Sequence, residues 1–166
     1  MKKTNLGMIA LGMGLALTAN GLAAGITGTK HDFSSKSWSP QNQICVICHT
    51  PHNALDPQLI PLWNHQATAA SFTLYTSSTF DGTIGQPTGA SKACLSCHDG
   101  TIALDSFGGS TNGTEFISGS AKLDTDLRND HPVSFTFDTT LATADGGLFD
   151  PAVKTVPELG GKTIKA

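Results

Sequence analysis

The sequence predicts a small, mostly irregular fold with a few short helices and short strands. The chain of 166 residues contains 18 glycines and 8 prolines, and turn-forming pairs such as Asp81-Gly82 and Asn112-Gly113 recur along it. No long stretch has apolar residues at the 3.6-residue spacing of an amphipathic helix. Alternating apolar residues predict short strands at 71–76 and 133–138. Such a chain buries too little apolar surface to build a core from side chains alone.

Two pentapeptides, Cys45–His49 and Cys94–His98, have the form C-x-x-C-H and contain every cysteine of the chain. This pattern is the attachment motif of c-type haem. The thiols of Cys45, Cys48, Cys94 and Cys97 would form thioethers with two haems, and His49 and His98 would bind the two irons as proximal ligands. We therefore expect a multihaem cytochrome c fold with short helices at the motifs and a core built around the haems.

Two other uses of paired cysteines fit the sequence less well. Structural zinc sites usually separate their C-x-x-C pairs by about 15–20 residues, whereas Cys48 and Cys94 lie much further apart. Zinc also gives no reason for a histidine directly after each pair. A thioredoxin-like redox site requires a βαβ setting, which the residues around the motifs do not predict.

The N-terminus has the composition of a secretory signal peptide. Lys2 and Lys3 precede an apolar run over 6–18, and small residues around Ala23 offer a cleavage site. The apolar run is shorter than the roughly 20 residues that a transmembrane helix needs. We therefore expect a signal peptide at 1–23 and a dihaem domain at 24–166. The protein would be exported to the periplasm, the outer surface or the extracellular space.

Removing this peptide changes the charge and the set of available iron ligands. The whole chain has 10 Lys and Arg against 13 Asp and Glu, so losing Lys2 and Lys3 leaves eight against thirteen, a net charge of −5. An acidic surface argues against nucleic acid as a partner. All three methionines lie in the expected signal peptide, so a His/Met haem is excluded and low-potential haems are expected.

A faint internal repeat relates the two motifs. Residues 45–56 read CVICHTPHNALD and residues 94–105 read CLSCHDGTIALD. Ala-Leu-Asp recurs at the same offset in both copies, which indicates duplication of a haem module. The copies differ where His52 of the first is matched by Thr101 of the second.

The four remaining histidines are the candidates for the distal iron ligands, in the order His131, His52, His65 and His31. His131 precedes Pro132, which gives it a rigid, extended setting, and His65 follows a Trp-Asn pair whose aromatic ring suits a porphyrin. His31 lies on an N-terminal arm that would reach over a haem. Two irons offer only two distal positions, so not all four histidines can be distal ligands.

The reach of the chain limits what His52 can bind. The α-carbons of two histidines on one iron lie roughly 12 Å apart, given metal–nitrogen bonds of about 2 Å. Three extended residues span at most about 10 Å. His52 therefore cannot share an iron with His49. It would bind the haem of His98 or a haem in a neighbouring subunit.

Four segments together resemble a known class of proteins: CVICHTPHNA (45–54), PLWNH (61–65), CLSCHDGTIALDS (94–106) and NDHPVSF (129–135). They look like small exported multihaem c-type cytochromes of metal-reducing, Geobacter-like bacteria. The first segment is also similar to the hexahaem subunits of extracellular cytochrome nanowires. The resemblance implies stacked bis-His haems, and it implies that His52 binds a haem in the next subunit. This chain has two haem motifs instead of six.

The sequence therefore predicts an electron-transfer protein and not an enzyme. It would carry electrons between other redox proteins or extracellular acceptors, either as a shuttle or as a subunit that assembles into filaments through His52. The alternative is a dihaem reductase or peroxidase with one open iron. That alternative needs a haem without a spare histidine, and this chain has spare histidines.

Overall fold

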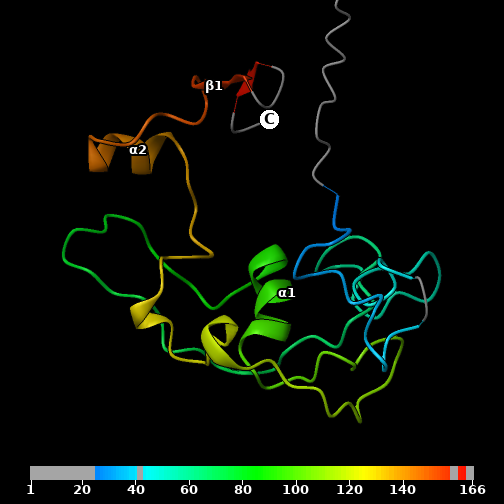
Figure 1. The fold of residues 1–166 in the computed structure, drawn as a ribbon. Coiled ribbons are helices and arrows are strands. Elements are labelled where there is room, and N and C mark those ends of the chain that lie inside the picture. The colour runs from blue at the N-terminus through cyan, green and yellow to red at the C-terminus, as the bar shows by residue number, and fades with distance from the viewer. Residues whose placement is uncertain (1–24, 41–42, 158–160, 164–166) are drawn as a thin grey trace, which may run out of the picture.

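The computed structural model describes residues 25–40, 43–157 and 161–163, so the expected signal peptide lies outside the described residues. Regular structure in the described part is sparse. In chain order it comprises α1 (Gly89–His98), η1 (Gly119–Ala121), η2 (Leu127–Asn129), α2 (Thr139–Asp145), β1 (Thr155–Val156) and β2 (Lys162–Thr163). In Figure 1, α1 (green) lies near the centre, the N-terminal loops (blue and cyan) lie to its right, and α2 (orange) lies to its upper left. The predicted scarcity of regular structure is confirmed.

Helix α1 is the longest regular element and carries the second C-x-x-C-H motif. It starts after Thr88, whose extended backbone (φ −133°, ψ 171°) provides the first helical acceptor, bonded by Lys92 N at 3.2 Å. It ends at His98 because Gly100 adopts a left-handed conformation (φ +73°) that a helix cannot continue through. Cys97 and His98 therefore lie in the last turn of the helix, directly before the loop that follows it.

Two small apolar clusters flank α1. One contains Leu59, Trp63 and Ala93, and the other contains Phe72, Leu95 and Leu127. Ala93 and Leu95 lie two positions apart on α1 and belong to different clusters, so the helix separates the two clusters. Clusters of this size bury little apolar surface for a chain of this length, as the composition predicts.

The strands predicted at 71–76 and 133–138 do not form, and that prediction was wrong. The backbone of Phe72 forms its hydrogen bonds with a side chain and not with a neighbouring strand. Its N–H donates to Gln86 Oε1 and its carbonyl accepts from Gln86 Nε2, each at 2.9 Å. Ser134 has a left-handed backbone (φ +57°), which interrupts the second run. Only isolated bridges remain at these segments, Thr73 with Asp126 and Ile84 with Phe135.

The sheet that does form, and the second helix, lie in the C-terminal part of the chain. Strands β1 and β2 pair in antiparallel register with Thr155 opposite Thr163. Helix α2 is capped at both ends, because Asp138 accepts a hydrogen bond from Leu141 N (2.9 Å) and Gly146 takes a left-handed conformation. These elements were not predicted, since two-residue strands and a seven-residue helix leave no periodic pattern.

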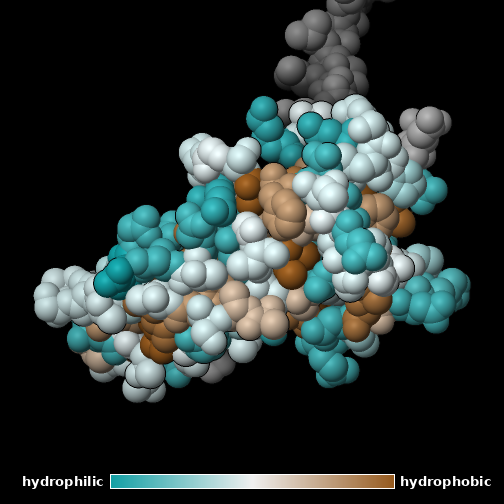
Figure 2. All heavy atoms as spheres, turned by 90° about the horizontal axis from the view of Figure 1, so that it is seen from below, coloured by the Kyte–Doolittle hydropathy of each residue, from teal (hydrophilic) through white to brown (hydrophobic). Residues whose placement is uncertain are grey.

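The surface is mostly polar, and its exposed apolar side chains are scattered. Figure 2 shows apolar side chains in small separate patches among hydrophilic ones on the face that it presents. Among the described residues, no helix is long and apolar enough to cross a membrane. The longest, α1, has 10 residues, about half of what a membrane span requires.

Gly113 supports the loop beside the second motif, and its replacement tests this packing. A Cβ on Gly113 would lie 2.4 Å from Asp105 Oδ1, 2.6 Å from Ser106 Oγ and 2.8 Å from Ala103 Cβ. Overpacking of this kind costs about 1–3 kcal/mol, so Gly113→Ala should lower the midpoint of denaturant-induced unfolding. The matched control is Gly85→Ala, because a Cβ on Gly85 meets nothing within 4 Å. Equal midpoints for the two variants would contradict the packing described here.

Candidate haem-binding site

The second motif gains its geometry from α1. Cys94 and Cys97 are three residues apart on the helix, which puts both thiols on one side of it. Cys94 is exposed and Cys97 is half-buried. His98 follows as the last helical residue. A planar group attached through both thiols would therefore lie along the last turn of the helix, next to the histidine.

The first motif reaches a similar local geometry without a helix. His49 N donates to Cys45 O at 2.8 Å, and Cys48 N donates to the same carbonyl at 3.2 Å. These two bonds close a single helical turn around the pair of thiols. The expected helix at this motif is thus reduced to one turn.

The imidazoles of both motifs are held in the same way by main-chain carbonyls. His49 Nδ1 lies 3.1 Å from Pro61 O, and His98 Nδ1 lies 2.7 Å from Ala121 O. A carbonyl only accepts, so Nδ1 carries the proton in each ring and Nε2 keeps its lone pair. Histidines that bind metals are typically oriented by such a bond from the other ring nitrogen. Both residues therefore fit the role of proximal iron ligand that the sequence predicts for them.

The two motifs lie close together, and Trp63 connects them. Its ring contacts His49 edge-on, with ring centroids 6.2 Å apart, and it packs in one cluster with Ala93, the neighbour of Cys94. Cys48 packs against the same cluster, and its carbonyl accepts from Asn64 N at 2.9 Å. Two planar groups attached at the motifs would therefore be near neighbours.

Burial keeps two of the four thiols protonated. It raises the pKa of Cys48, with further increases from Cys45 and Cys94. It also raises the pKa of Cys97 to about 12, with further increases from Cys48, Asp99 and Cys94. A redox-active C-x-x-C pair uses a thiolate of lowered pKa, so these environments do not favour that alternative. Among the described residues, no three His, Cys, Asp or Glu side chains converge as a metal cage would require.

A hollow lies beside the first motif. It has a volume of about 420 Å³, within the range of about 300–1,000 Å³ typical of ligand sites. Both Cys45 and His49 line it, so an exposed cysteine and the histidine of the same motif border a common space. Its lining residues are Gln43, Ile44, Cys45, Val46, His49 and Pro51.

Of the four distal candidates, His31 is the one placed against a motif histidine. Its ring centroid lies 6.0 Å from that of His98, with the ring planes inclined by 59°. Two imidazoles on opposite faces of one iron have centroids about 6 Å apart, since each metal–nitrogen bond is about 2 Å and each nitrogen lies about 1 Å from its ring centre. The His31–His98 separation therefore fits a bis-histidine pair.

His65 is fully buried beside the second motif. Its Nδ1 lies 2.9 Å from Gln66 O, its Nε2 lies 3.1 Å from Ala103 O, and Nε2 is also 3.6 Å from Cys97 Sγ. Burial lowers the pKa of His65, which favours the neutral ring, and a neutral ring donates only one hydrogen bond. Only one of the two ring nitrogens of His65 can therefore donate to its nearby carbonyl, and the other nitrogen lies beside a carbonyl without a hydrogen bond.

His52 and His131 are both exposed. The ring of His52 makes no hydrogen bond or ring contact within the part of the chain that the structure describes. His131 Nδ1 lies 3.2 Å from the carbonyl of the adjacent Pro132. Neither ring is placed against His49 or His98, so their assignment as distal ligands stays a prediction.

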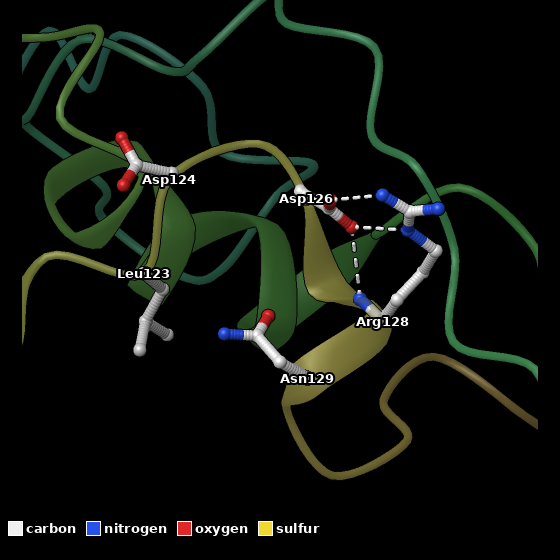
Figure 3. Close-up of a pocket in the computed structure, with 5 residues that line it drawn as sticks. All are labelled: Leu123, Asp124, Asp126, Arg128 and Asn129. Atoms are coloured by element: carbon white, nitrogen blue, oxygen red, sulfur yellow. Dashed lines mark hydrogen bonds and ion pairs between the residues drawn. The ribbon is translucent and has the colours of Figure 1, made fainter.

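A second hollow near α1 is acidic, and its charges are already paired. Figure 3 shows Arg128 turned toward Asp126 within the lining of this hollow. Arg128 Nε donates to Asp126 Oδ1 at 2.8 Å, and this bond holds the pKa of Asp126 at about 2. Asp124 pairs with Lys122 at 2.6 Å. With both carboxylates paired, the hollow offers no clear site for a cation.

Sequence reasoning missed Asp99, and it noted the Trp63 ring as suited to a porphyrin but not its contacts with both motifs. Asp99 is almost fully buried directly after His98, and Trp63 is buried between the motifs with no hydrogen-bond partner for its Nε1. The repeat contained a signal for Asp99, because the equivalent position of the first copy is the neutral Thr50. The carbonyls of Pro61 and Ala121 leave no signal in a sequence, since any residue supplies one.

No protein-family model and no curated protein sequence matches this chain. The resemblance to exported multihaem cytochromes therefore stays a prediction from the motifs.

Replacing Trp63 tests whether it joins the two motifs. Trp63→Ala should lower the free energy of unfolding by about 3–5 kcal/mol, because a buried aromatic ring is lost. Trp63→Phe keeps a ring in the cluster and removes an N–H that has no partner, so it should cost much less. Denaturant unfolding monitored by circular dichroism gives both values. Equal costs for Trp63→Phe and Trp63→Ala would contradict a role of Trp63 that depends on packing of its ring.

Proposed function

We propose that the chain is a secreted dihaem c-type cytochrome that carries electrons and catalyses no reaction of its own. The observation that carries the proposal is the shared arrangement at Cys45–His49 and Cys94–His98. In each motif, a turn of chain sets two thiols beside an imidazole whose Nδ1 is fixed by a carbonyl. Two independent segments thus offer the same ligand atom, Nε2, next to the same pair of thiols.

The chain's residues would attach, orient and enclose the cofactors. Each cysteine pair would hold one haem c through thioethers, and His49 and His98 would bind the irons through Nε2. When bound, a haem supplies a reversible one-electron change at iron. His31 is the distal ligand that we propose for the iron of His98, on the basis of the 6.0 Å separation of their rings.

The spacing of the motifs supports transfer between the two sites. Trp63 contacts both the first motif and the residue before Cys94, so one buried side chain packs between the two motifs. Close, rigid spacing is what electron transfer between bound cofactors requires. The partners that we propose are other redox proteins or extracellular acceptors, reached after export to the periplasm or beyond.

The first site differs from the second in its distal ligand. Among the described residues, the ring contact of His49 is with Trp63 and not with a histidine. His52 is exposed, and its ring makes no hydrogen bond or ring contact in the described part of the chain. It is too close to His49 in sequence to bind the same iron. We infer that His52 of one chain binds an iron in a neighbouring chain when the protein assembles into filaments. A soluble shuttle is the other form of the same function.

A dihaem reductase or peroxidase is the second candidate, and the same observation favours it. If no chain supplies a histidine opposite His49, that iron keeps an open position where a substrate would bind. The exposure of His49 and the hollow beside it agree with such access. Carbon monoxide, which binds only to an iron with an open position, separates the two functions.

His31→Ala tests the proposed ligand pair. Losing His31 should open the iron of His98, so the reduced protein should bind one more carbon monoxide per chain than the unaltered protein does. The absorption spectrum before and after carbon monoxide gives this number. Lys30→Ala is the matched control, because it changes an exposed neighbour on the same arm. Unchanged carbon monoxide binding in His31→Ala would show that another residue fills the position.

His52→Ala tests the filament form of the function. The variant should lose assembly, and one haem per chain should lack a histidine ligand, because the ligand comes from the neighbouring chain. Light scattering and electron microscopy measure assembly, and the absorption spectrum measures ligation. Gln58→Ala changes another exposed residue of the same loop and should assemble normally. Filaments formed by His52→Ala would show that His52 does not link neighbouring chains and would overturn this form of the proposal.

A further inference from the structure

We propose that Leu62 is a positioning residue for the haem at the first motif. Its left-handed backbone turns the carbonyl of Pro61 toward His49, and the resulting hydrogen bond lowers the reduction potential of the iron that His49 binds. This inference rests on the proposed function and adds to it, because it assigns a role to a residue that neither binds iron nor attaches haem.

Leu62 lies in a tight turn formed by residues 60–63. Trp63 N donates to Ile60 O at 3.2 Å, which closes the turn. Pro61 occupies the second position of the turn, and Leu62, with φ +60°, occupies the third. Proline at the second position and a positive φ at the third define a type II turn, whose third position normally holds glycine or asparagine.

The turn type decides where the Pro61 carbonyl points. Type I and type II turns differ by a flip of the peptide between their second and third residues, and here that peptide carries the Pro61 carbonyl. In the observed type II form, His49 Nδ1 lies 3.1 Å from Pro61 O. A type I turn would give Leu62 an unstrained, negative φ, but it would point this carbonyl to the opposite side of the turn. The left-handed backbone of Leu62 is therefore what gives His49 its acceptor.

A leucine is unfavourable at this position on local grounds. Four non-glycine residues of the described chain have a positive φ, and Leu62 is the one with a large apolar side chain; the others are Asn53, Asp124 and Ser134. In the left-handed conformation the side chain crowds the backbone. Packing offers little compensation, because Leu62 is 49% exposed. The conformation is therefore held by the hydrogen bonds on either side of it.

These hydrogen bonds tie the turn to the first motif. Leu62 O accepts from Thr50 N, and Asn64 N donates to Cys48 O, each at 2.9 Å. His49 lies between these two bonds, in a backbone bridge with the segment that follows the turn. The strain at Leu62 is thus offset by contacts with the residues that surround the ligand histidine. Backbone strain that the surrounding structure holds in place is typical of functional sites.

The second motif obtains the same bond without a strained residue. Its acceptor, Ala121 O, lies 2.7 Å from His98 Nδ1 and ends η1. The left-handed residue of that turn is Gly119 (φ +68°), and glycine adopts this conformation without a steric penalty. Of the two motif histidines, His49 is therefore the one whose acceptor depends on a strained residue.

The bond affects the haem because it changes the donor strength of the histidine. A carbonyl that accepts from Nδ1–H raises the basicity of the nitrogen that binds the metal. A more basic ligand favours the oxidised iron, which carries one more positive charge, and so lowers the reduction potential. Turning the Pro61 carbonyl away from His49 would raise that potential. The turn thus sets one of the two potentials between which an electron passes.

The test is a redox titration of the secreted, haem-loaded full chain, followed by absorption spectroscopy. Leu62→Val places a β-branched side chain at the left-handed position, which such residues avoid, and so favours the flipped turn. We expect one midpoint potential to rise, with about a threefold to tenfold change in the ratio of reduced to oxidised haem at a fixed potential. A tenfold change is about 59 mV for one electron. The other midpoint should move much less.

Two variants serve as controls. Leu62→Asn also removes the apolar side chain, but asparagine tolerates the left-handed conformation, so both midpoints should stay close to those of the unaltered chain. Leu55→Val repeats the substitution at another leucine of the same loop, which is 43% exposed and has no positive φ. It should change neither midpoint.

Proton nuclear magnetic resonance measures the hydrogen bond itself. The Nδ1 proton of His49 should exchange with deuterium oxide faster in Leu62→Val than in Leu62→Asn, because the flipped turn leaves this proton without its acceptor. If Leu62→Val is not secreted, Leu62→Ala and Leu62→Gly replace the pair, since alanine is destabilised at a positive φ and glycine is not. The alanine variant should then show the faster exchange and the higher midpoint.

The outcomes separate this inference from the proposed function. If the spectrum of the denatured protein in alkaline pyridine shows no haem c, the proposed function itself fails. If haem c is present and the two members of the pair have equal midpoints or equal proton exchange, the turn does not position His49 and the inference is wrong. A higher midpoint and faster exchange in the member that disfavours a positive φ support both.

Discussion

The hydrogen bond from Nδ1 of each motif histidine to a main-chain carbonyl is the constraint on which the functional account depends. Without it, the exposed His49 and the half-buried His98 would have rings of undefined orientation and tautomer. With it, each ring has one orientation and one free nitrogen. Most of the loop structure around the motifs serves this end, because the segments at Pro61 and Ala121 must be held where their carbonyls meet the rings.

A fold held this way needs little regular structure. Helix α1 fixes the second motif, Trp63 joins it to the first, and the two apolar clusters on either side of the helix remain small. Side chains satisfy backbone groups that a sheet would pair in other folds, as the amide of Gln86 does for the N–H and carbonyl of Phe72. The arrangement suits a protein whose remaining apolar centre is supplied by covalently attached cofactors.

The C-x-x-C-H spacing predicts which residues would hold haem, because covalent attachment fixes the motif locally. The sequence ranked His131 first among the distal candidates and His31 last, whereas the structure places the ring of His31 with its centroid 6.0 Å from that of His98. That pairing depends on the path of the N-terminal arm, which spacing does not encode. The strands expected at 71–76 and 133–138 failed because a left-handed Ser134 and the Gln86 amide override an alternating pattern.

The central claim is that each chain carries two covalently attached haems. The intact mass of the protein purified from the medium or periplasm of an expression host that matures c-type cytochromes tests it most directly. The account predicts the mass of the chain after loss of residues 1–23 plus two haems. A mass equal to the polypeptide alone, or a mass that includes zinc and no haem, would contradict it.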